Sequence, residues 1–89
     1  MVNLSKKCFI EKFFSLSANV DFSGAYIAAN RNITGLHLGW IVGYSDDYNQ
    51  YTLVTAKRLL RNFRTLDAAI EFVSENNLGD LGSVNVSFA

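Results

Sequence analysis

The chain has 89 residues, of which 49% are hydrophobic and 18% are charged, and its eight basic side chains balance eight acidic ones. This length supports one hydrophobic core, so we expect a single domain over residues 1–89. Zero net charge excludes a general electrostatic attraction to nucleic acid or anionic lipid, and a charged share below the usual value of about 25% leaves apolar surface that favours self-association.

The first expected element is an amphipathic helix over residues 5–17, with Ser5 as its N-cap. Apolar residues recur there at helical spacing, and Cys8 lies among them, so we expect this cysteine in the core. The aromatic residues of the helix cover more than the stripe that one small core can absorb. We therefore expect the same helix to provide the contacts of a dimer, through Phe9, Phe13 and Phe14.

Four strands are expected to follow this helix. The first covers residues 22–29 and leads into a loop that contains Asn30, Asn32 and Gly35. The second covers residues 36–44 and has an apolar side chain at every other position: Leu36, Leu38, Trp40, Val42 and Tyr44. A turn at residues 45–49 leads to a third strand over residues 51–55. Residues 56–58 then separate the third strand from a fourth over residues 59–64.

A second helix is expected after Thr65, which is a suitable N-cap. Its core face has apolar residues at positions i, i+3, i+4 and i+7: Leu66, Ala69, Ile70 and Val73. Asn76 and Asn77 end the helix, and residues 84–88 alternate as a short final strand. The element order α-β-β-β-β-α-β predicts an α+β fold. In this fold a small antiparallel sheet of four to five strands carries an N-terminal helix and a helix from the C-terminal half on one face.

The residues offer little for catalysis. Cys8 and His37 are the only possible cysteine nucleophile and histidine base, and no glycine-rich oxyanion turn accompanies either residue. No carboxylates stand at ligand-like spacing from them, as a zinc site would need. His37 is expected on the surface, on the strand face opposite Trp40, and turn formation explains the adjacent carboxylates of Asp46 and Asp47. We therefore expect no enzymatic activity, no metal and no cofactor.

The sequence also predicts the compartment. No stretch approaches the roughly 18 uncharged apolar residues that span a bilayer, and Glu11 and Lys12 interrupt the only run that follows basic residues near the start. The single cysteine, Cys8, cannot form an internal disulfide. We expect a cytoplasmic protein without a membrane partner.

The charges are segregated along the chain. Half of all basic residues fall within residues 57–64, and the last helix then carries acids every four residues, at Asp67, Glu71 and Glu75. In one interpretation the basic hairpin and this acidic stripe pair within one molecule or across a dimer. In the other, the hairpin contacts nucleic-acid phosphates. Because tyrosine is enriched at interfaces, the candidate interaction surface combines the basic residues with the hairpin tyrosines. It comprises Lys57, Arg58, Arg61, Arg64, Tyr44, Tyr48 and Tyr51.

The segment 51–88 joins the strand sequence YTLVT at residues 51–55, the sequence RNFRTLDAA at residues 61–69 and a closing strand. This combination resembles small accessory proteins of plasmids and other mobile elements, which share the hairpin, an R-x-F-x-[ST]-L-D-A-A helix start and a short final strand. The resemblance implies an origin in bacteria or mobile elements and an accessory role. The R-x-F-x-T turn is also similar to that of three-stranded DNA-binding modules at integrase N-termini, which lack the leading helix and the final strand.

The sequence therefore predicts a non-enzymatic binding or accessory protein that acts through protein contacts, with itself as a homodimer and with another protein. The alternative is a nucleic-acid-binding regulator that uses the basic hairpin at residues 57–64. An enzyme of unrecognised type is the third hypothesis.

Overall fold

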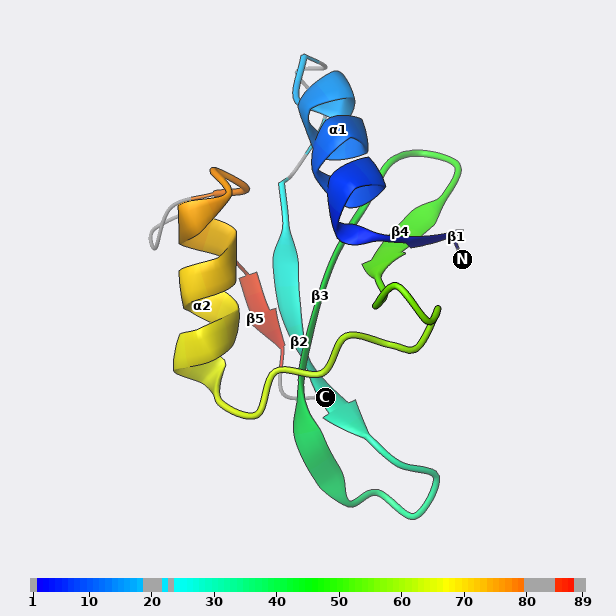
Figure 1. Ribbon diagram of the computed structural model, residues 1–89, viewed down its shortest axis with the longest axis vertical. Coiled ribbons are helices and arrows are strands. Elements are labelled where there is room, and N and C mark those ends of the chain that lie inside the picture. Colours follow the sequence, from blue (N-terminus) through cyan, green and yellow to red (C-terminus); the bar gives the residue numbers. More distant parts are fainter. Residues whose placement is uncertain (1, 19–21, 23, 80–84, 88–89) are drawn as a thin grey trace.

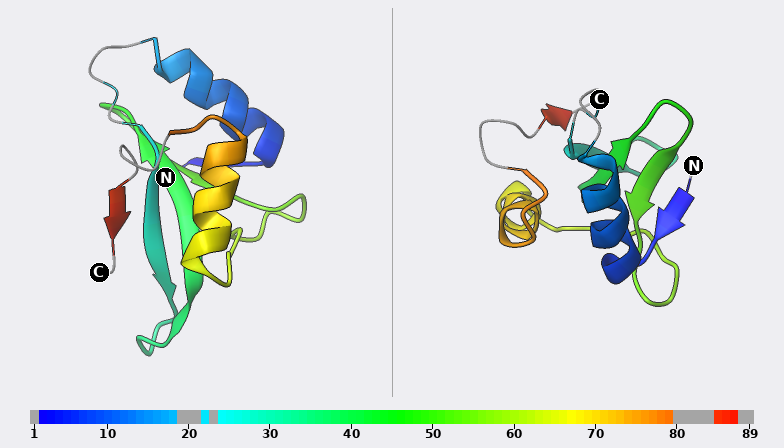
Figure 2. Two further views of the ribbon diagram at one scale, coloured as in Figure 1. Left: turned by 90° about the vertical axis from the view of Figure 1, so that its left-hand side faces the viewer. Right: turned by 90° about the horizontal axis from the view of Figure 1, so that it is seen from above.

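Alternating apolar residues and two amphipathic segments build a mixed sheet with two helices on one of its faces (Figure 1). The computed structural model describes residues 2–18, 22, 24–79 and 85–87. Its elements are β1 (Val2–Leu4), α1 (Lys6–Leu16), β2 (Tyr26–Arg31), β3 (His37–Ser45), β4 (Gln50–Leu53), α2 (Leu66–Glu75) and β5 (Asn85–Ser87). Figure 2 shows both helices on the same side of the sheet. The predicted α+β class is confirmed.

The five strands lie in the order β1-β4-β3-β2-β5. The three central strands are antiparallel, as expected, with Tyr26 opposite Gly43 and Gly43 opposite Thr52. The edge strands differ from the prediction, because β1 pairs with β4 and β5 pairs with β2 in parallel. In the sequence, α1 connects β1 to β2 and α2 connects β4 to β5. A connection through a helix lets the second strand run in the same direction as the first, as parallel pairing requires.

Two predicted features of the strand order are wrong. β1 was not expected, since its three residues are too short to show alternation. The expected strand over residues 59–64 is replaced by two isolated bridges, from Leu60 to Val54 and from Phe63 to Trp40. This segment leaves β4 and crosses to β3, so it does not follow either strand for long enough to form a ladder. Residues 84 and 88 of the expected last strand lie outside the described residues.

The core lies between the helices and the sheet. Tyr44 is at its centre, with ring centroids 4.5 Å from Phe9, 5.4 Å from Phe13 and 5.3 Å from Tyr51. Its hydroxyl group donates a hydrogen bond of 2.5 Å to the carbonyl oxygen of Phe9. The other buried apolar residues of the cluster are Ala25, Ile27, Trp40, Val42, Leu53, Phe63, Ala69, Val73 and Leu78. The inward direction of Trp40, Val42, Tyr44, Ala69 and Val73 was predicted correctly.

A β-bulge interrupts the predicted alternation of β3. Asn30 faces Gly39 and Arg31 faces His37, so Leu38 is an extra residue in this strand. Leu38 is consequently exposed, and Leu36 is exposed in the turn before β3, so neither is buried as predicted. His37 is on the surface as expected, but its ring contacts the Trp40 ring at a centroid distance of 5.0 Å and so does not lie on the opposite face.

The bulge has a local cause at Gly39. This residue has φ +150°, and a Cβ atom there would approach Asn62 Oδ1 and the Phe63 carbonyl oxygen to 2.4 Å. Only glycine allows the chain around residue 63 to come this close to β3. The backbone N–H and carbonyl groups of Trp40 and Phe63 then form two mutual hydrogen bonds of 2.8 Å.

The helix boundaries agree with the predicted ranges, whereas the capping differs between the two helices. Thr65 Oγ1 accepts a hydrogen bond of 3.1 Å from the Ala68 N–H, as expected for an N-cap. Ser5 has the extended backbone of an N-cap, but its side chain forms no capping bond. Cys8 is exposed, and its predicted core position is wrong. It lies about 100° around the helix axis from Phe9, which belongs to the buried stripe.

Candidate functional site

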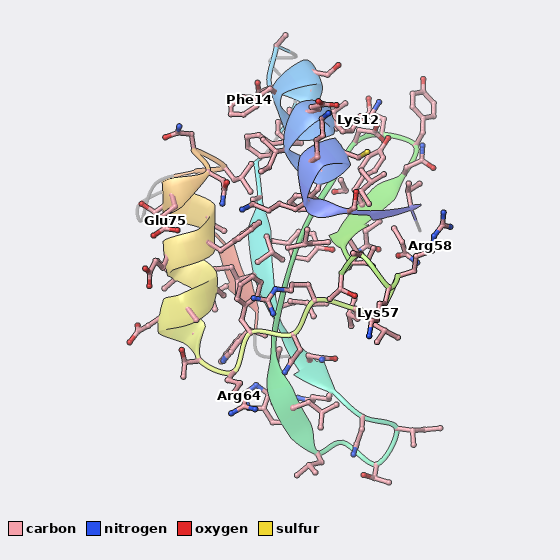
Figure 3. All side chains as sticks on the ribbon, viewed as in Figure 1. Lys12, Phe14, Lys57, Arg58, Arg64 and Glu75 are labelled. Carbon is pink, nitrogen blue, oxygen red and sulfur yellow. The ribbon has the colours of Figure 1, made fainter. Side chains whose placement is uncertain are left out.

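The basic residues of the candidate surface lie on a loop that leaves β4. Thr55 holds the loop closed, because its N–H donates to the Leu59 carbonyl oxygen at 2.7 Å and its carbonyl oxygen accepts from the Arg58 N–H at 2.9 Å. Arg58 has φ +61° in this tight turn. Lys57, Arg58, Arg61 and Arg64 are all exposed. Figure 3 shows Lys57 and Arg58 on the flank of the molecule opposite Glu75.

The acidic stripe does not pair with these basic residues. Among the described residues, no ion pair within 4.0 Å joins Asp67, Glu71 or Glu75 to a basic side chain. All three acids are exposed on α2. The interpretation that the stripe and the basic hairpin neutralise each other within one molecule is therefore wrong. Pairing across a dimer stays a prediction.

The fold brings two further basic residues close to Arg61, one of the predicted surface residues. Lys6 and Lys7, in the first turn of α1, line a cleft of about 380 Å³ together with Arg61. Apolar side chains of Leu53, Val54, Ala56 and Phe72, with Ser5 and Thr55, complete its lining. An adjoining hollow of about 370 Å³ shares Ser5 and residues 54–56 and adds Arg58 and Cys8. Lys6 and Arg61 are far apart in the sequence, so no local pattern could indicate this convergence.

The three hairpin tyrosines lie in different environments. Tyr44 and Tyr51 are buried, so, contrary to the prediction, they are not part of an interaction surface. Tyr48 is 91% exposed in the turn between β3 and β4. Asp46 organises that turn, since its carboxylate accepts hydrogen bonds from the N–H groups of Tyr48 and Asn49 at 2.8 and 2.7 Å. These bonds hold the pKa of Asp46 below its usual range.

The predicted dimer contacts of α1 are largely inaccessible. Phe9 and Phe13 are buried in the core of their own molecule and are not free to contact a second copy. Phe14 is 48% exposed and is the only one of the three that a partner can reach. Phe13 is held in the core by Tyr44 and Phe22, whose rings both pack against it.

The sequence did not indicate the tip of the β2–β3 hairpin as a candidate surface. Ile33 is fully exposed there, and Leu36 and Leu38 are 62% and 47% exposed. The hairpin projects beyond the body of the molecule (Figure 1). Asn32 fixes its conformation, because Oδ1 accepts hydrogen bonds from the N–H groups of Thr34 and Leu36 at 3.0 and 2.9 Å. An isolated isoleucine inside a polar turn was the only sequence signal for this tip.

Groups suited to catalysis are not brought together. His37 contacts Trp40 at the start of β3, whereas Cys8 lines the hollow beside Arg58. Within the described part of the chain, no three His, Cys, Asp or Glu side chains could jointly hold a metal ion. None of the helices found in that part is both long and apolar enough to cross a bilayer. No family model, curated protein or solved structure matches the chain.

Proposed function

We propose that this chain is a non-enzymatic binding protein that acts through protein contacts and that the tip of the β2–β3 hairpin is its main contact. The exposed apolar side chains of Ile33, Leu36 and Leu38 carry this proposal. Burying one such side chain against a partner contributes about 1.5–3 kcal/mol. A projecting hairpin can insert its tip into a partner without rearrangement of the core.

The conformation of the tip supports the same role. Arg31 Nη1 donates to the Gly35 carbonyl oxygen at 3.3 Å, and Gly35 supplies φ +89°. Together with the hydrogen bonds of Asn32, these contacts hold the loop in one shape before binding. A preorganised loop loses less conformational entropy when it binds, which favours affinity.

Self-association is part of the proposal, with the hairpin tip in place of α1 as the dimer contact. The low share of charged residues in the chain, 18%, supports it. An accessory role in a bacterium or a mobile element rests on the resemblance of residues 51–88, and the single cysteine supports a cytoplasmic location.

Light scattering across a concentration series tests the proposal. We expect a dimer at micromolar concentration and a monomer for Ile33→Asp, because the new charge cannot be buried without a partner. Tyr48→Asp is the matched control, since Tyr48 is equally accessible on a different turn. This control variant should remain dimeric. A wild-type monomer at every concentration, or an unaffected Ile33→Asp dimer, would contradict the proposed contact.

Nucleic-acid binding is the second candidate function. It is favoured by the observation that Lys57, Arg58, Arg61 and Arg64 form no ion pair with the acidic stripe, among the residues described. Binding to an oligonucleotide should then weaken steeply with salt, because contacts with phosphates release counterions. Combining Arg61→Ala with Arg64→Ala should flatten this salt dependence, whereas Lys12→Ala should not. The absence of salt-sensitive binding would exclude this function.

A further inference from the structure

The cleft beside the first turn of α1 lies in a different part of the molecule from the hairpin tip. In this part of the molecule α1 packs beside β1 and β4, while α2 packs on β3. The lining of the cleft includes Leu53 at the end of β4, Val54 directly after it and Phe72 from α2. We propose that this cleft binds a small organic anion with an apolar body and one carboxylate, phosphate or sulfonate group.

The charges around the cleft favour an anion. Lys6, Lys7 and Arg61 are the charged residues of the lining, and no carboxylate contributes to it. Figure 3 shows Glu75 on the outer flank of α2, whereas Phe72 of the same helix lines the cleft. The potential inside is therefore positive although the whole chain is neutral.

Arg61 is held in place for this role. Its backbone N–H donates to the Leu53 carbonyl oxygen at 3.1 Å, and its guanidinium group lies 4.7 Å from the centre of the Phe63 ring. In the described part of the structure it forms no ion pair with a carboxylate. A planar guanidinium with free donors matches the two oxygens of a carboxylate or phosphate.

The apolar lining of the cleft indicates the chemistry of the uncharged part of the ligand. This apolar lining comes from the nearly buried Leu53 and Val54, the half-buried Phe72 and the exposed Ala56. A volume of about 380 Å³ lies within the range of small-molecule sites, which is about 300–1,000 Å³. An inorganic anion would leave this apolar surface in contact with water. The lining instead suits a ring system or a short aliphatic chain attached to the anionic group.

Fluorescence titration with 8-anilinonaphthalene-1-sulfonate tests the proposal on the full chain, because this probe combines an aromatic body with a single negative charge. We expect saturable binding of one probe molecule, with competition by decanoate. Lys6→Gln and Arg61→Gln should each weaken binding by about two- to fivefold, as for single exposed charge contacts. Lys57→Gln is the matched control, because Lys57 is a nearby basic residue outside the lining, and it should bind like the wild type.

Two further measurements distinguish binding in this cleft from binding elsewhere on the molecule. The neutral analogue N-phenyl-1-naphthylamine should bind equally to wild type, Lys6→Gln and Arg61→Gln, since it makes no charge contact. Ile33→Asp should bind the sulfonate probe with unchanged affinity, so that a failure of the hairpin contact leaves this result intact. Unchanged melting temperatures must accompany these variants.

Several outcomes would overturn the proposal. They are an absence of saturable binding, equal losses for Lys57→Gln and Arg61→Gln, or loss of the signal in Ile33→Asp, which would place the probe on the hairpin tip. Displacement of the probe by a single-stranded oligonucleotide but not by decanoate would also overturn it, in favour of a polyanion surface.

Discussion

Tyr44→Phe removes one hydroxyl group from the centre of the core, where it donates a hydrogen bond of 2.5 Å to the Phe9 carbonyl oxygen. That oxygen lies inside α1 and keeps its helical hydrogen bond, so it is not left without a donor. The expected loss is therefore that of one ordinary buried hydrogen bond, about 1 kcal/mol. For a chain of this size it lowers the melting temperature by about 4–8 °C.

Thermal unfolding followed by circular dichroism measures this loss, and the two other hairpin tyrosines provide matched controls. Tyr51→Phe removes a hydrogen bond of 3.0 Å to Asp46 Oδ2, which is only partly buried, so it should cost less. Tyr48→Phe should change nothing, because this side chain is 91% exposed. If Tyr48→Phe destabilised the protein as much as Tyr44→Phe, the three assigned environments would be incorrect.

Tyr44 also makes the stability of the folded state depend on pH in the alkaline range. Burial, with a further contribution from the nearby Tyr51, raises the pKa of Tyr44 far above its ordinary value of 10.0. At a pH below 10.0 the Tyr44 phenol is neutral in both the folded and the unfolded chain. As the pH rises above it, only the unfolded chain ionises, so the folded state loses stability. Tyr44→Phe should show a smaller loss above pH 10.0 in the same unfolding assay.

Three further predictions concern the backbone contacts. Thr65→Ala should cost about 0.5–2 kcal/mol of unfolding free energy and Ser5→Ala almost nothing, because only Thr65 forms a capping bond; equal costs in denaturant titrations would contradict this. Gly39→Ala should cost about 1–3 kcal/mol, since its Cβ collides with Asn62, and a neutral result would mean that the bulge relaxes. Asp46→Ala should destabilise the protein at neutral pH. Because the pKa of Asp46 is lowered in the folded state, the difference in stability between wild type and Asp46→Ala should shrink as the pH falls below 3.8. A difference in melting temperature that stays constant with pH would refute this prediction.

Elements that depend on neighbouring residues could be predicted from the sequence. The helical spacing of Phe9 and Phe13 placed α1, and Thr65 marked the start of α2. Alternation placed the inward face of β3 from Trp40 to Tyr44. These signals are local, because a period of 3.6 or 2 is visible within a few residues and buries one face whatever the rest of the chain does.

Features that depend on residues far apart in the chain could not be predicted from the sequence. The register shift at Leu38 follows from the pairing of Asn30 with Gly39, and the route of residues 59–64 follows from the pairing of Phe63 with Trp40. Similarly, the convergence of Lys6 with Arg61 requires α1 to pack beside the end of β4. None of these contacts has a local period. Tertiary packing determines which residues far apart in the chain pair with one another. These pairings give rise to the exposed hairpin tip and the basic cleft.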